Sequence, residues 1–328
     1  MATPPPAGGP ELVTLGCRLN LAESATIAAH ARAGGLGGVA IVNTCAVTAA
    51  ATRDSLRAIR RLARARPERP ILVTGCAATL EPERFASLPG VTRVVTNAAK
   101  LEPVSWGAPD APAVAAPPLD APLPGMRAFV EIQHGCDHRC TFCVIPLARG
   151  PSRSVPLGAI VARIAALAAR GVGEVVLTRV DIASWGRDLP GAPTLGGAVR
   201  RLLAAVPALP RLRLSSLDPA ACDDSLVAAF ATEERLMPHA HLSLQAGDDL
   251  VLKRMKRRHR RVDALALAAR LREARPGIAL GADVIAGFPT ESDDAAARTR
   301  DLVAELNLAF VHVFPYSPRA GTPAARGL

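Results

Sequence analysis

Residues 128–143 read AFVEIQHGCDHRCTFC, and this stretch decides how the rest of the chain is interpreted. It begins with an apolar, strand-like run and ends with three cysteines, Cys136, Cys140 and Cys143, in the spacing C-x3-C-x2-C. Thiolates are the usual ligands of iron–sulfur clusters, and three of them can hold three irons of a four-iron cluster. The fourth iron would stay open to an outside ligand. The stretch therefore predicts a cluster that can bind a second molecule.

The overall composition limits the class of protein that could hold this cluster. The chain has 328 residues, enough for two domains, and 49% of them are hydrophobic, enough for a sizeable core. No apolar run reaches the length of a membrane span, and residues 1–10 lack the pattern of a signal peptide. We therefore expect a cytoplasmic protein with no membrane partner. Seven cysteines in a reducing compartment indicate cluster or metal ligation rather than disulfides.

The first hundred residues contain three more cysteines in a repeated arrangement. Cys17, Cys45 and Cys76 each end a short β-rich run, and the three runs are 13–17, 39–45 and 71–76. The predicted helices are 22–33, 46–66 and 81–88, and a fourth strand is predicted at 91–96. Alternating strands and helices indicate a parallel sheet, whose ligands bind beyond the carboxyl ends of the strands. The three thiols are expected to converge on a second cluster, although each could instead be an ordinary core cysteine.

Residues 103–125 contain seven prolines and no apolar period, which predicts an extended linker between two domains. Six strands are predicted after it, alternating with Ala- and Leu-rich helices such as 158–170 and 263–274. The six strands are 129–133, 174–178, 211–215, 241–245, 278–285 and 310–314. Six such units predict an open (β/α)6 barrel, because a closed eight-unit barrel needs more chain. Catalytic groups of such barrels lie at the carboxyl ends of the strands, and Cys136 follows the first strand.

The two cysteine groups together resemble the methylthiotransferase family of radical S-adenosylmethionine enzymes, over nearly the whole chain. Two segments, TLGCRLN at 14–20 and VNTCAVT at 42–48, look like the members that modify threonylcarbamoyladenosine in tRNA. The segments 135–143, RSVP at 153–156 and HVFPYSP at 312–318 are similar to the same members.

The resemblance implies an α/β fold with a flavodoxin-like, parallel-sheet N-terminal domain (residues 1–102) and a radical S-adenosylmethionine barrel (residues 126–328). The first domain would hold an auxiliary 4Fe-4S cluster on Cys17, Cys45 and Cys76. The barrel would hold the radical 4Fe-4S cluster on Cys136, Cys140 and Cys143, whose open iron would chelate S-adenosyl-L-methionine. The family's small C-terminal RNA-binding β-domain is expected to be absent.

The implied reaction is the transfer of a methylthio group to carbon 2 of N6-threonylcarbamoyladenosine at tRNA position 37. A 5′-deoxyadenosyl radical would remove the hydrogen, because an aromatic C–H bond resists acid–base activation. A sulfur species on the auxiliary cluster would supply the methylthio group. A reductant such as a flavodoxin or ferredoxin would deliver the electrons, and the anticodon stem-loop of the tRNA would be the substrate.

Further positions are candidates for cofactor binding. Phe142 could pack against the adenine of the cofactor, and Asp181 could bind its ribose or amino group. The hydroxyl and amide side chains at strand ends could orient it: Thr178, Ser215, Ser216 and Gln245. Core packing or a plain structural hydrogen bond is the alternative for each. The turn GFPT at 287–290 resembles a family turn near the cofactor, Arg179 stands where the family usually has glycine, and Cys222 is a spare thiol.

The net charge of +10 suits a polyanionic partner. One short segment, 253–261, concentrates the basic side chains Lys253, Arg254, Lys256, Arg257, Arg258, Arg260 and Arg261. Such a cluster can neutralise RNA phosphates, although it could also be a solvated helix end. Aromatic residues make up only 3% of the chain, so recognition is expected to rely on shape and phosphates rather than on base stacking. An anticodon-loop base is already unpaired, which lowers the cost of presenting it to a pocket.

Three alternatives remain open. A methylthiotransferase could act on isopentenyladenosine in tRNA or on a ribosomal-protein aspartate. The chain could also be a non-catalytic iron–sulfur RNA-binding protein. Finally, the cysteines could hold zinc, but structural zinc sites usually have four protein ligands and each group here supplies three.

Overall fold

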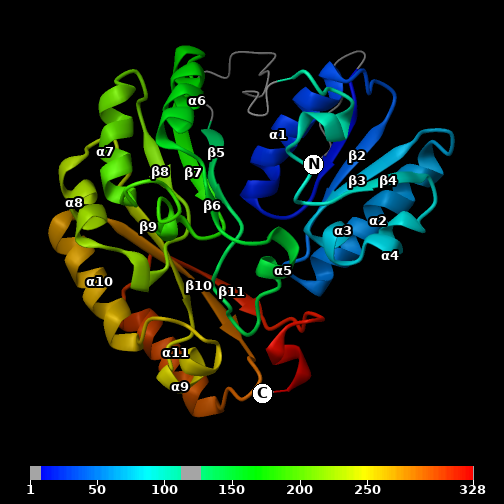
Figure 1. Ribbon diagram of the computed structural model, residues 1–328. Coiled ribbons are helices and arrows are strands. Elements are labelled where there is room, and N and C mark those ends of the chain that lie inside the picture. Colours follow the sequence, from blue (N-terminus) through cyan, green and yellow to red (C-terminus); the bar gives the residue numbers. More distant parts are fainter. Residues whose placement is uncertain (1–8, 112–126, 328) are drawn as a thin grey trace. The chain divides into compact units, whose positions relative to one another are not determined.

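The computed structural model describes residues 9–111 and 127–327 (Figure 1). The chain divides into two compact units. Within the described residues, the first unit consists of 9–111 together with Val144–Pro151, and the second consists of 127–143 and 152–327. The segment Val144–Pro151, which directly follows the last cysteine of the C-x3-C-x2-C motif, thus groups with the N-terminal part of the chain.

The first unit is built on a parallel four-stranded sheet. Its strands β1 (Glu11–Thr14), β2 (Ala40–Thr44), β3 (Ile71–Gly75) and β4 (Val91–Val95) lie in the order β1-β2-β3-β4. Val42 and Val73 pack with Ile59 of α2 (Ala49–Ala65) on one face. Ile41 and Leu72 pack with Ile27 of α1 (Arg18–Ala33) on the other. Because alternate side chains point to opposite faces, both faces are buried, which explains the continuous apolar runs. The predicted parallel sheet is confirmed.

Two local predictions for this unit were wrong. The expected helix at 81–88 is two short helices, α3 (Cys76–Leu80) and α4 (Pro82–Ala86). Gly75, with φ +99°, lets a helix start directly at Cys76, and Pro82 starts the second helix. Part of the expected linker, Pro103–Trp106, is the 3₁₀ helix η1, and the buried Trp106 donates its indole N–H to the Lys100 carbonyl. Residues 112–125 of the expected linker lie outside the described residues.

The second unit contains the six predicted parallel strands. These are β5 (Arg127–His134), β7 (Glu174–Arg179), β8 (Leu212–Leu214), β9 (His239–Gln245), β10 (Ala279–Ala286) and β11 (Phe310–Pro315). A parallel bridge between Leu217 and Leu242 joins the β5-β7-β8 group to β9-β10-β11, so the strands form an open barrel. A seventh, short strand that was not predicted, β6 (Arg153–Ser154), pairs antiparallel with β5.

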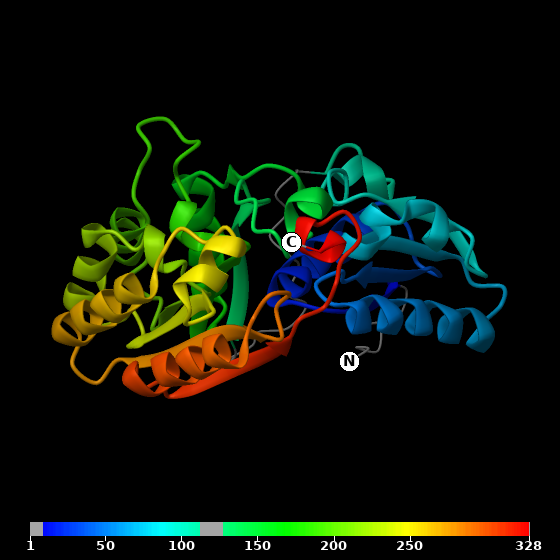
Figure 2. The same cartoon turned by 90° about the horizontal axis from the view of Figure 1, so that it is seen from below.

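Helices cover the outer side of this curved layer of strands (Figures 1 and 2). They are α6 (Leu157–Ala169), α7 (Leu195–Ala205), α8 (Asp224–Thr232), α10 (Arg261–Ala274) and α11 (Asp293–Glu305). The shorter elements are α9 (Asp249–Arg254) and the 3₁₀ helices η2 (Ile182–Ser184), η3 (Pro219–Ala221) and η4 (Pro323–Arg326). In the ranges 9–111 and 127–327, no helix is both long enough and apolar enough to cross a lipid bilayer.

The barrel strands have one apolar face and one polar face. Buried apolar side chains such as Ile132, Leu177, Leu242 and Leu280 alternate along the strands with polar side chains. The polar side chains are on the face turned away from the helices and include Glu131, Gln133, Thr178, His241 and Asp283. A polar inner face suits a polar substrate better than an apolar one.

Candidate functional site

The C-x3-C-x2-C motif lies in the loop at the carboxyl end of β5. Gly135, with φ +71°, turns the chain out of the strand, a conformation that glycine adopts without cost. Cys136 is buried, and Cys140 and Cys143 are half-buried. The Cys143 N–H donates to the Cys140 carbonyl at 3.1 Å. Three soft sulfur donors on one short loop suit an iron–sulfur cluster.

Contacts on both sides of Thr141 hold this loop. The Thr141 N–H donates to the Met255 carbonyl at 3.1 Å, and its hydroxyl donates to the Arg254 carbonyl at 2.8 Å. The ring of Phe142 meets Phe288 edge-on, with centroids 6.5 Å apart, in a small apolar cluster. The structure thus shows the packing role of Phe142, and its contact with a cofactor stays a prediction.

A buried arginine supplies positive charge to the motif. Arg257 Nη1 lies 3.6 Å from Cys140 Sγ, and Arg257 Nη2 donates to Asp218 Oδ2 at 3.1 Å and to the Ser243 carbonyl at 2.8 Å. Burial alone would raise the pKa of Asp218, but Arg257 and Arg258 outweigh it and lower that pKa. A guanidinium beside the thiols offsets the negative charge of a thiolate-bound cluster. The structure therefore does not support the expected RNA contact of Arg257, because its side chain is only 7% exposed.

A cavity of about 460 Å³ opens beside the motif. It is lined by Asp137, His138, Arg139, Ser152, Asp181, Ser184, Arg187, Asp188, Lys256 and Arg258. His138 Nε2 lies 3.1 Å from Asp181 Oδ2, and His138 Nδ1 lies 3.7 Å from Asp218 Oδ2. Burial is the main cause that lowers the pKa of His138, although both carboxylates oppose it. Convergent polar groups of both signs suit a zwitterionic cofactor with a ribose.

The sequence prediction placed Asp181 in the site but missed Asp218. Asp218 follows the predicted candidates Ser215 and Ser216 by a few residues, so the position after a strand end was the available signal. His138, inside the cysteine motif, was not predicted to face a cofactor cavity. The ligand atoms of Cys136, His138 and Asp181 do lie within 4.8 Å of one another, but the two other motif cysteines are sulfur donors on the same loop.

The other strand-end candidates lie where the topology predicts. Thr178 is buried at the end of β7, and Ser216 is half-buried after β8. Within the described ranges, the buried hydroxyl of Ser215 has no hydrogen-bond partner, so a bound ligand could satisfy it. Gln245 has φ +71°, and such strain in a non-glycine residue is common at functional sites. The side chain of Arg179 lies outside the described part of the structure.

The basic segment 253–261 spans the end of α9, a turn and the start of α10. The side chains of Lys253, Arg254, Lys256, Arg258 and Arg260 are exposed. Arg261 instead pairs with Glu305 at 2.5 Å and donates to the Arg298 carbonyl at 2.7 Å. Five of the seven predicted RNA-binding side chains are therefore available to a polyanion.

In the first unit, the second cysteine group lies at the carboxyl ends of β1, β2 and β3. Cys17 is exposed, whereas Cys45 and Cys76 are buried. Gly16 has φ +93°, and a Cβ added there would lie 2.5 Å from Cys45 Sγ, so only glycine allows this approach. Burial chiefly, with the charges of Cys17 and Cys76 adding to it, raises the pKa of Cys45 to about 11. The three thiols are thus close enough to interact, as one cluster requires.

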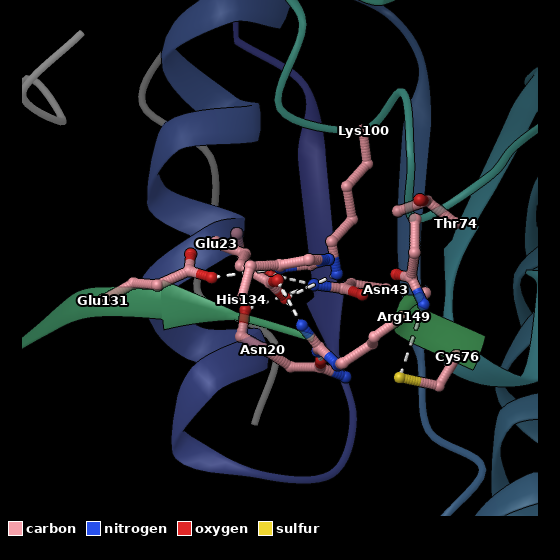
Figure 3. A network of polar contacts seen from close by, with 12 residues as sticks. Asn20, Glu23, Asn43, Thr74, Cys76, Lys100, Glu131, His134 and Arg149 are labelled. Atoms are coloured by element: carbon pink, nitrogen blue, oxygen red, sulfur yellow. Dashed lines mark hydrogen bonds and ion pairs between the residues drawn. The ribbon is translucent and has the colours of Figure 1, made fainter. Parts of the chain in front are cut away.

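A buried polar network lies close to Cys76 (Figure 3). Arg149 of α5 (Ile145–Arg149) donates to Glu23 Oε1 at 2.6 Å and to Asn20 Oδ1 at 2.7 Å. Lys100 Nζ reaches Glu23 Oε2 at 2.5 Å. The Glu23 carboxylate is therefore shared by two cations in a buried site. Burial alone would lower the pKa of Arg149, but Glu23 chiefly, together with Cys76 and Cys17, raises it. An anionic cluster on these cysteines would be a further electrostatic partner of the Arg149 guanidinium.

Asparagine side chains connect this network to the cysteine loops. The Asn20 amide donates to the Leu15 carbonyl at 2.7 Å and to the Thr44 carbonyl at 3.0 Å, next to Cys17 and Cys45 respectively. The Asn97 amide lies 3.5 Å from Cys76 Sγ and 2.7 Å from the Ala148 carbonyl. The sulfur donor set, the close approach of Gly16 to Cys45 and the neighbouring Arg149 guanidinium all fit an iron–sulfur cluster.

Cys222 lies apart from both groups. Its pKa is raised to about 12, chiefly by burial, and its thiol donates to the Asp218 carbonyl at 3.5 Å. No disulfide links any of the seven cysteines, all of which are in the described ranges.

Comparison with known proteins assigns both units. Residues 130–303 match the radical SAM superfamily, and residues 11–97 match a family described as uncharacterized protein family UPF0004. The chain is 46% identical to the threonylcarbamoyladenosine tRNA methylthiotransferase MtaB of Rickettsia prowazekii, over 96% of this chain and 77% of that protein. It is 34% identical to MtaB of Thermotoga maritima, over 95% of this chain and 76% of that protein.

A second class of relatives carries a different substrate in its name. The tRNA-2-methylthio-N(6)-dimethylallyladenosine synthase of Sorangium cellulosum is 35% identical, over 96% of this chain and 72% of that protein. Among solved structures, the radical S-adenosylmethionine methyltransferase TsrM of Kitasatospora setae has a TM-score of 0.65 and 18% identity, over 88% of this chain and 66% of that chain. The latter likeness supports the fold alone.

Proposed function

The chain belongs to the methylthiotransferase family of radical S-adenosylmethionine enzymes, and we propose that it methylthiolates carbon 2 of N6-threonylcarbamoyladenosine at position 37 of tRNA. Members of the radical SAM superfamily use S-adenosylmethionine and a 4Fe-4S cluster. The observation that carries the proposal is the pair of cysteine trios, one at the carboxyl ends of β1, β2 and β3 and the other in the loop after β5, each beside an arginine.

The cofactor assignments follow from the two donor sets. Cys136, Cys140 and Cys143 would hold the radical cluster, and Cys17, Cys45 and Cys76 would hold an auxiliary cluster. When bound, the first supplies the reducing electron that cleaves S-adenosylmethionine, and the second supplies sulfur to the substrate. We also propose the division into residues 1–102 and 126–328, which the family matches at 11–97 and 130–303 support.

Around the radical site, the protein's side chains bind and orient. Asp181 and His138 form a hydrogen-bonding pair in the cavity wall, which suits the ribose hydroxyls and the amino group of the cofactor. The unsatisfied hydroxyl of Ser215 offers one more contact, and Thr178, Ser216 and Gln245 remain candidates. Arg257 compensates negative charge beside Cys140.

The remaining proposals concern the partners. We propose that the exposed cations Lys253, Arg254, Lys256, Arg258 and Arg260 contact the phosphates of the anticodon stem-loop. A small electron-transfer protein such as a flavodoxin or ferredoxin would supply electrons. A cytoplasmic location fits this chemistry, because tRNA and reduced thiols occur there.

One experiment tests the two-cluster proposal. The triple variant Cys17→Ala, Cys45→Ala, Cys76→Ala is reconstituted anaerobically next to the wild-type chain. We expect about eight irons per wild-type chain and about four in the variant. The variant should still release 5′-deoxyadenosine from S-adenosylmethionine but should not methylthiolate RNA. Colourless protein that holds zinc, or wild-type protein without cofactor cleavage, would contradict the proposal.

A second experiment tests the substrate. Mass spectrometry of tRNA nucleosides from a deletion strain should show loss of the methylthio form of threonylcarbamoyladenosine. Loss of only the methylthio isopentenyladenosine would instead identify the sister activity. Intact tRNA together with an unmodified ribosomal-protein aspartate would identify the protein-modifying one.

A further inference from the structure

A second polar group lies on the inner face of the barrel and takes no part in the site described so far. It consists of His241 on β9, Asp283 on β10 and His312 on β11, with Asp283 directly opposite His312 in the strand register. His241 Nε2 lies 2.8 Å from Asp283 Oδ1, and His312 Nδ1 lies 3.2 Å from the same oxygen. The two imidazole rings have centroids 5.3 Å apart.

Aromatic rings frame this group. The ring of Phe310 is stacked on His239 and on His241, with centroids 5.5 Å apart in each pair. It lies over Gly281, where an added Cβ would come within 2.2 Å of the ring. Phe314 meets His312 edge-on at 6.4 Å. The group is therefore held in a fixed arrangement rather than left as mobile surface side chains.

The exposure of the three side chains is graded. The side chain of His241 is 10% exposed, that of Asp283 is 23% exposed and that of His312 is 55% exposed. The two less exposed residues lie beside the third, whose ring is the most exposed of the three. In the tautomer in which His312 Nδ1 donates to Asp283 Oδ1, His312 Nε2 is left for a ligand.

Strand alternation relates this group to the radical site. Ile285 lies two residues beyond Asp283 on the same face of β10, roughly 7 Å along the strand. Ile285 packs in the cluster that contains Phe142, a residue of the cysteine motif. A substrate whose reacting atom lies near the motif could thus place another part against His312.

We propose that His241, Asp283 and His312 recognise the polar N6 substituent of the target adenosine, an inference that rests on the proposed function. The threonylcarbamoyl group carries a carboxylate, a hydroxyl and a urea, whereas the dimethylallyl group is a hydrocarbon. His312 Nε2 can accept from the hydroxyl or, in the imidazolium form, donate to the carboxylate. Asp283 can accept from the urea N–H through its second oxygen.

The same group would discriminate against the hydrocarbon substituent. Covering a carboxylate and two imidazoles with a dimethylallyl group removes their water and gives no hydrogen bond in return. Sites built to bind a polar group reject the apolar analogue strongly for this reason. The relatives include both classes, so this group offers a structural ground for choosing between them.

The test uses the anaerobically reconstituted full chain and its variant His312→Phe, which keeps an aromatic ring but removes both nitrogens. The matched control is His239→Phe, a histidine on β9 that also stacks on Phe310 and lies two residues before His241 on the same strand. Three anticodon stem-loop RNAs are compared, with threonylcarbamoyl-, dimethylallyl- or unmodified adenosine. The readouts are RNA affinity, methylthio product, release of 5′-deoxyadenosine without RNA, and zinc content.

We expect His312→Phe to weaken binding of the threonylcarbamoyl RNA at least tenfold relative to the unmodified RNA, with RNA-free cofactor cleavage unchanged. The control should bind like wild type. Equal losses for all three RNAs, no loss at all, or stoichiometric zinc that the variant loses would overturn the inference. If the wild-type enzyme methylthiolates only the dimethylallyl RNA, the proposed function itself fails. If the wild-type enzyme methylthiolates the threonylcarbamoyl RNA and His312→Phe prefers that RNA to the same degree, only the role of His312 is contradicted.

Discussion

At the scale of single residues, Arg149 has the most demanding position in the first unit. It is buried, and it shares the Glu23 carboxylate with Lys100. Removing one partner from such a buried group of charges is costly. Cys76 and Cys17 are close enough to interact electrostatically with the Arg149 guanidinium.

We predict that Arg149→Gln makes the reduction potential of the auxiliary cluster more negative. The reduced cluster carries more negative charge than the oxidised cluster, so it loses more stabilisation when the positive side chain is removed. The apoprotein should also lose roughly 3 kcal/mol of stability, since Glu23 keeps only one cationic partner. Potentiometric titration followed by electron paramagnetic resonance measures the first effect, in a background where Cys136, Cys140 and Cys143 are alanine. Arg149→Lys should restore part of the potential, and Arg300→Gln on exposed α11 is the control. An unchanged potential in Arg149→Gln would argue against this role.

His259 makes the apoprotein sensitive to acid. Burial and the neighbouring Arg257 lower its pKa from 6.5 to about 4. The unfolded chain therefore binds a proton between pH 6.5 and 4 that the folded chain does not bind, so stability falls as the pH falls through this window. We expect wild-type apoprotein to lose about 2 kcal/mol between pH 7 and pH 5 relative to His259→Leu. Urea unfolding at both pH values measures the difference, and equal pH profiles of the two proteins would contradict it.

At the scale of elements, the loops after the strands carry more of the candidate site residues than the strands themselves. The strand positions could be predicted because buried parallel strands are short apolar runs between turn residues. The helix expected at 81–88 was wrong because a glycine and a proline divide that segment into two short helices. Pro103–Trp106 was expected to be extended because proline content alone does not reveal that Trp106 is buried.

The loop after β1 allows a test of the close approach between Gly16 and Cys45. We predict that Gly16→Ala loses about half of the iron of the reconstituted protein, because its Cβ would overlap with Cys45. Gly35→Ala is the matched control: Gly35 also has a positive φ, +70°, but nothing lies within 4 Å of an added Cβ. Iron and sulfide analysis should separate the two variants, and equal iron losses would show that backbone strain alone explains the effect.

At the scale of the whole molecule, the sequence predicts net charge but not where the charges are used. Lys253 and Lys256 are exposed, whereas Arg257 is buried against Asp218 and Arg261 pairs with Glu305. A basic run alone could not separate these cases.

We therefore predict that Lys253→Gln with Lys256→Gln weakens tRNA binding and lowers the slope of log affinity against log salt by about 1.5, as expected for two lost phosphate contacts. The control removes two exposed charges from outer helices, Arg200→Gln with Arg300→Gln, and should leave the slope unchanged. Binding isotherms at several salt concentrations measure both. Equal slopes for the two double variants would place the RNA elsewhere.

The parts of the site differed in how far they could be predicted. The cysteine groups could be proposed from the sequence because cysteine ligation is chemically specific and the C-x3-C-x2-C spacing is local. Arg149 was not, because its partner Glu23 lies 126 residues away in sequence and either residue alone is unremarkable. His241, Asp283 and His312 were missed for the same reason: three strands bring them together, and no motif connects them.

The segment Val144–Pro151 has one more consequence. It begins directly after Cys143 but is part of the first unit, where it carries Arg149. Only six positions separate Cys143, a proposed ligand of the radical cluster, from Arg149, the proposed counter-ion of the auxiliary cluster. We therefore expect that lengthening this short span by a few glycines would disturb the maturation of both proposed clusters together, although every cysteine and Arg149 would still be present.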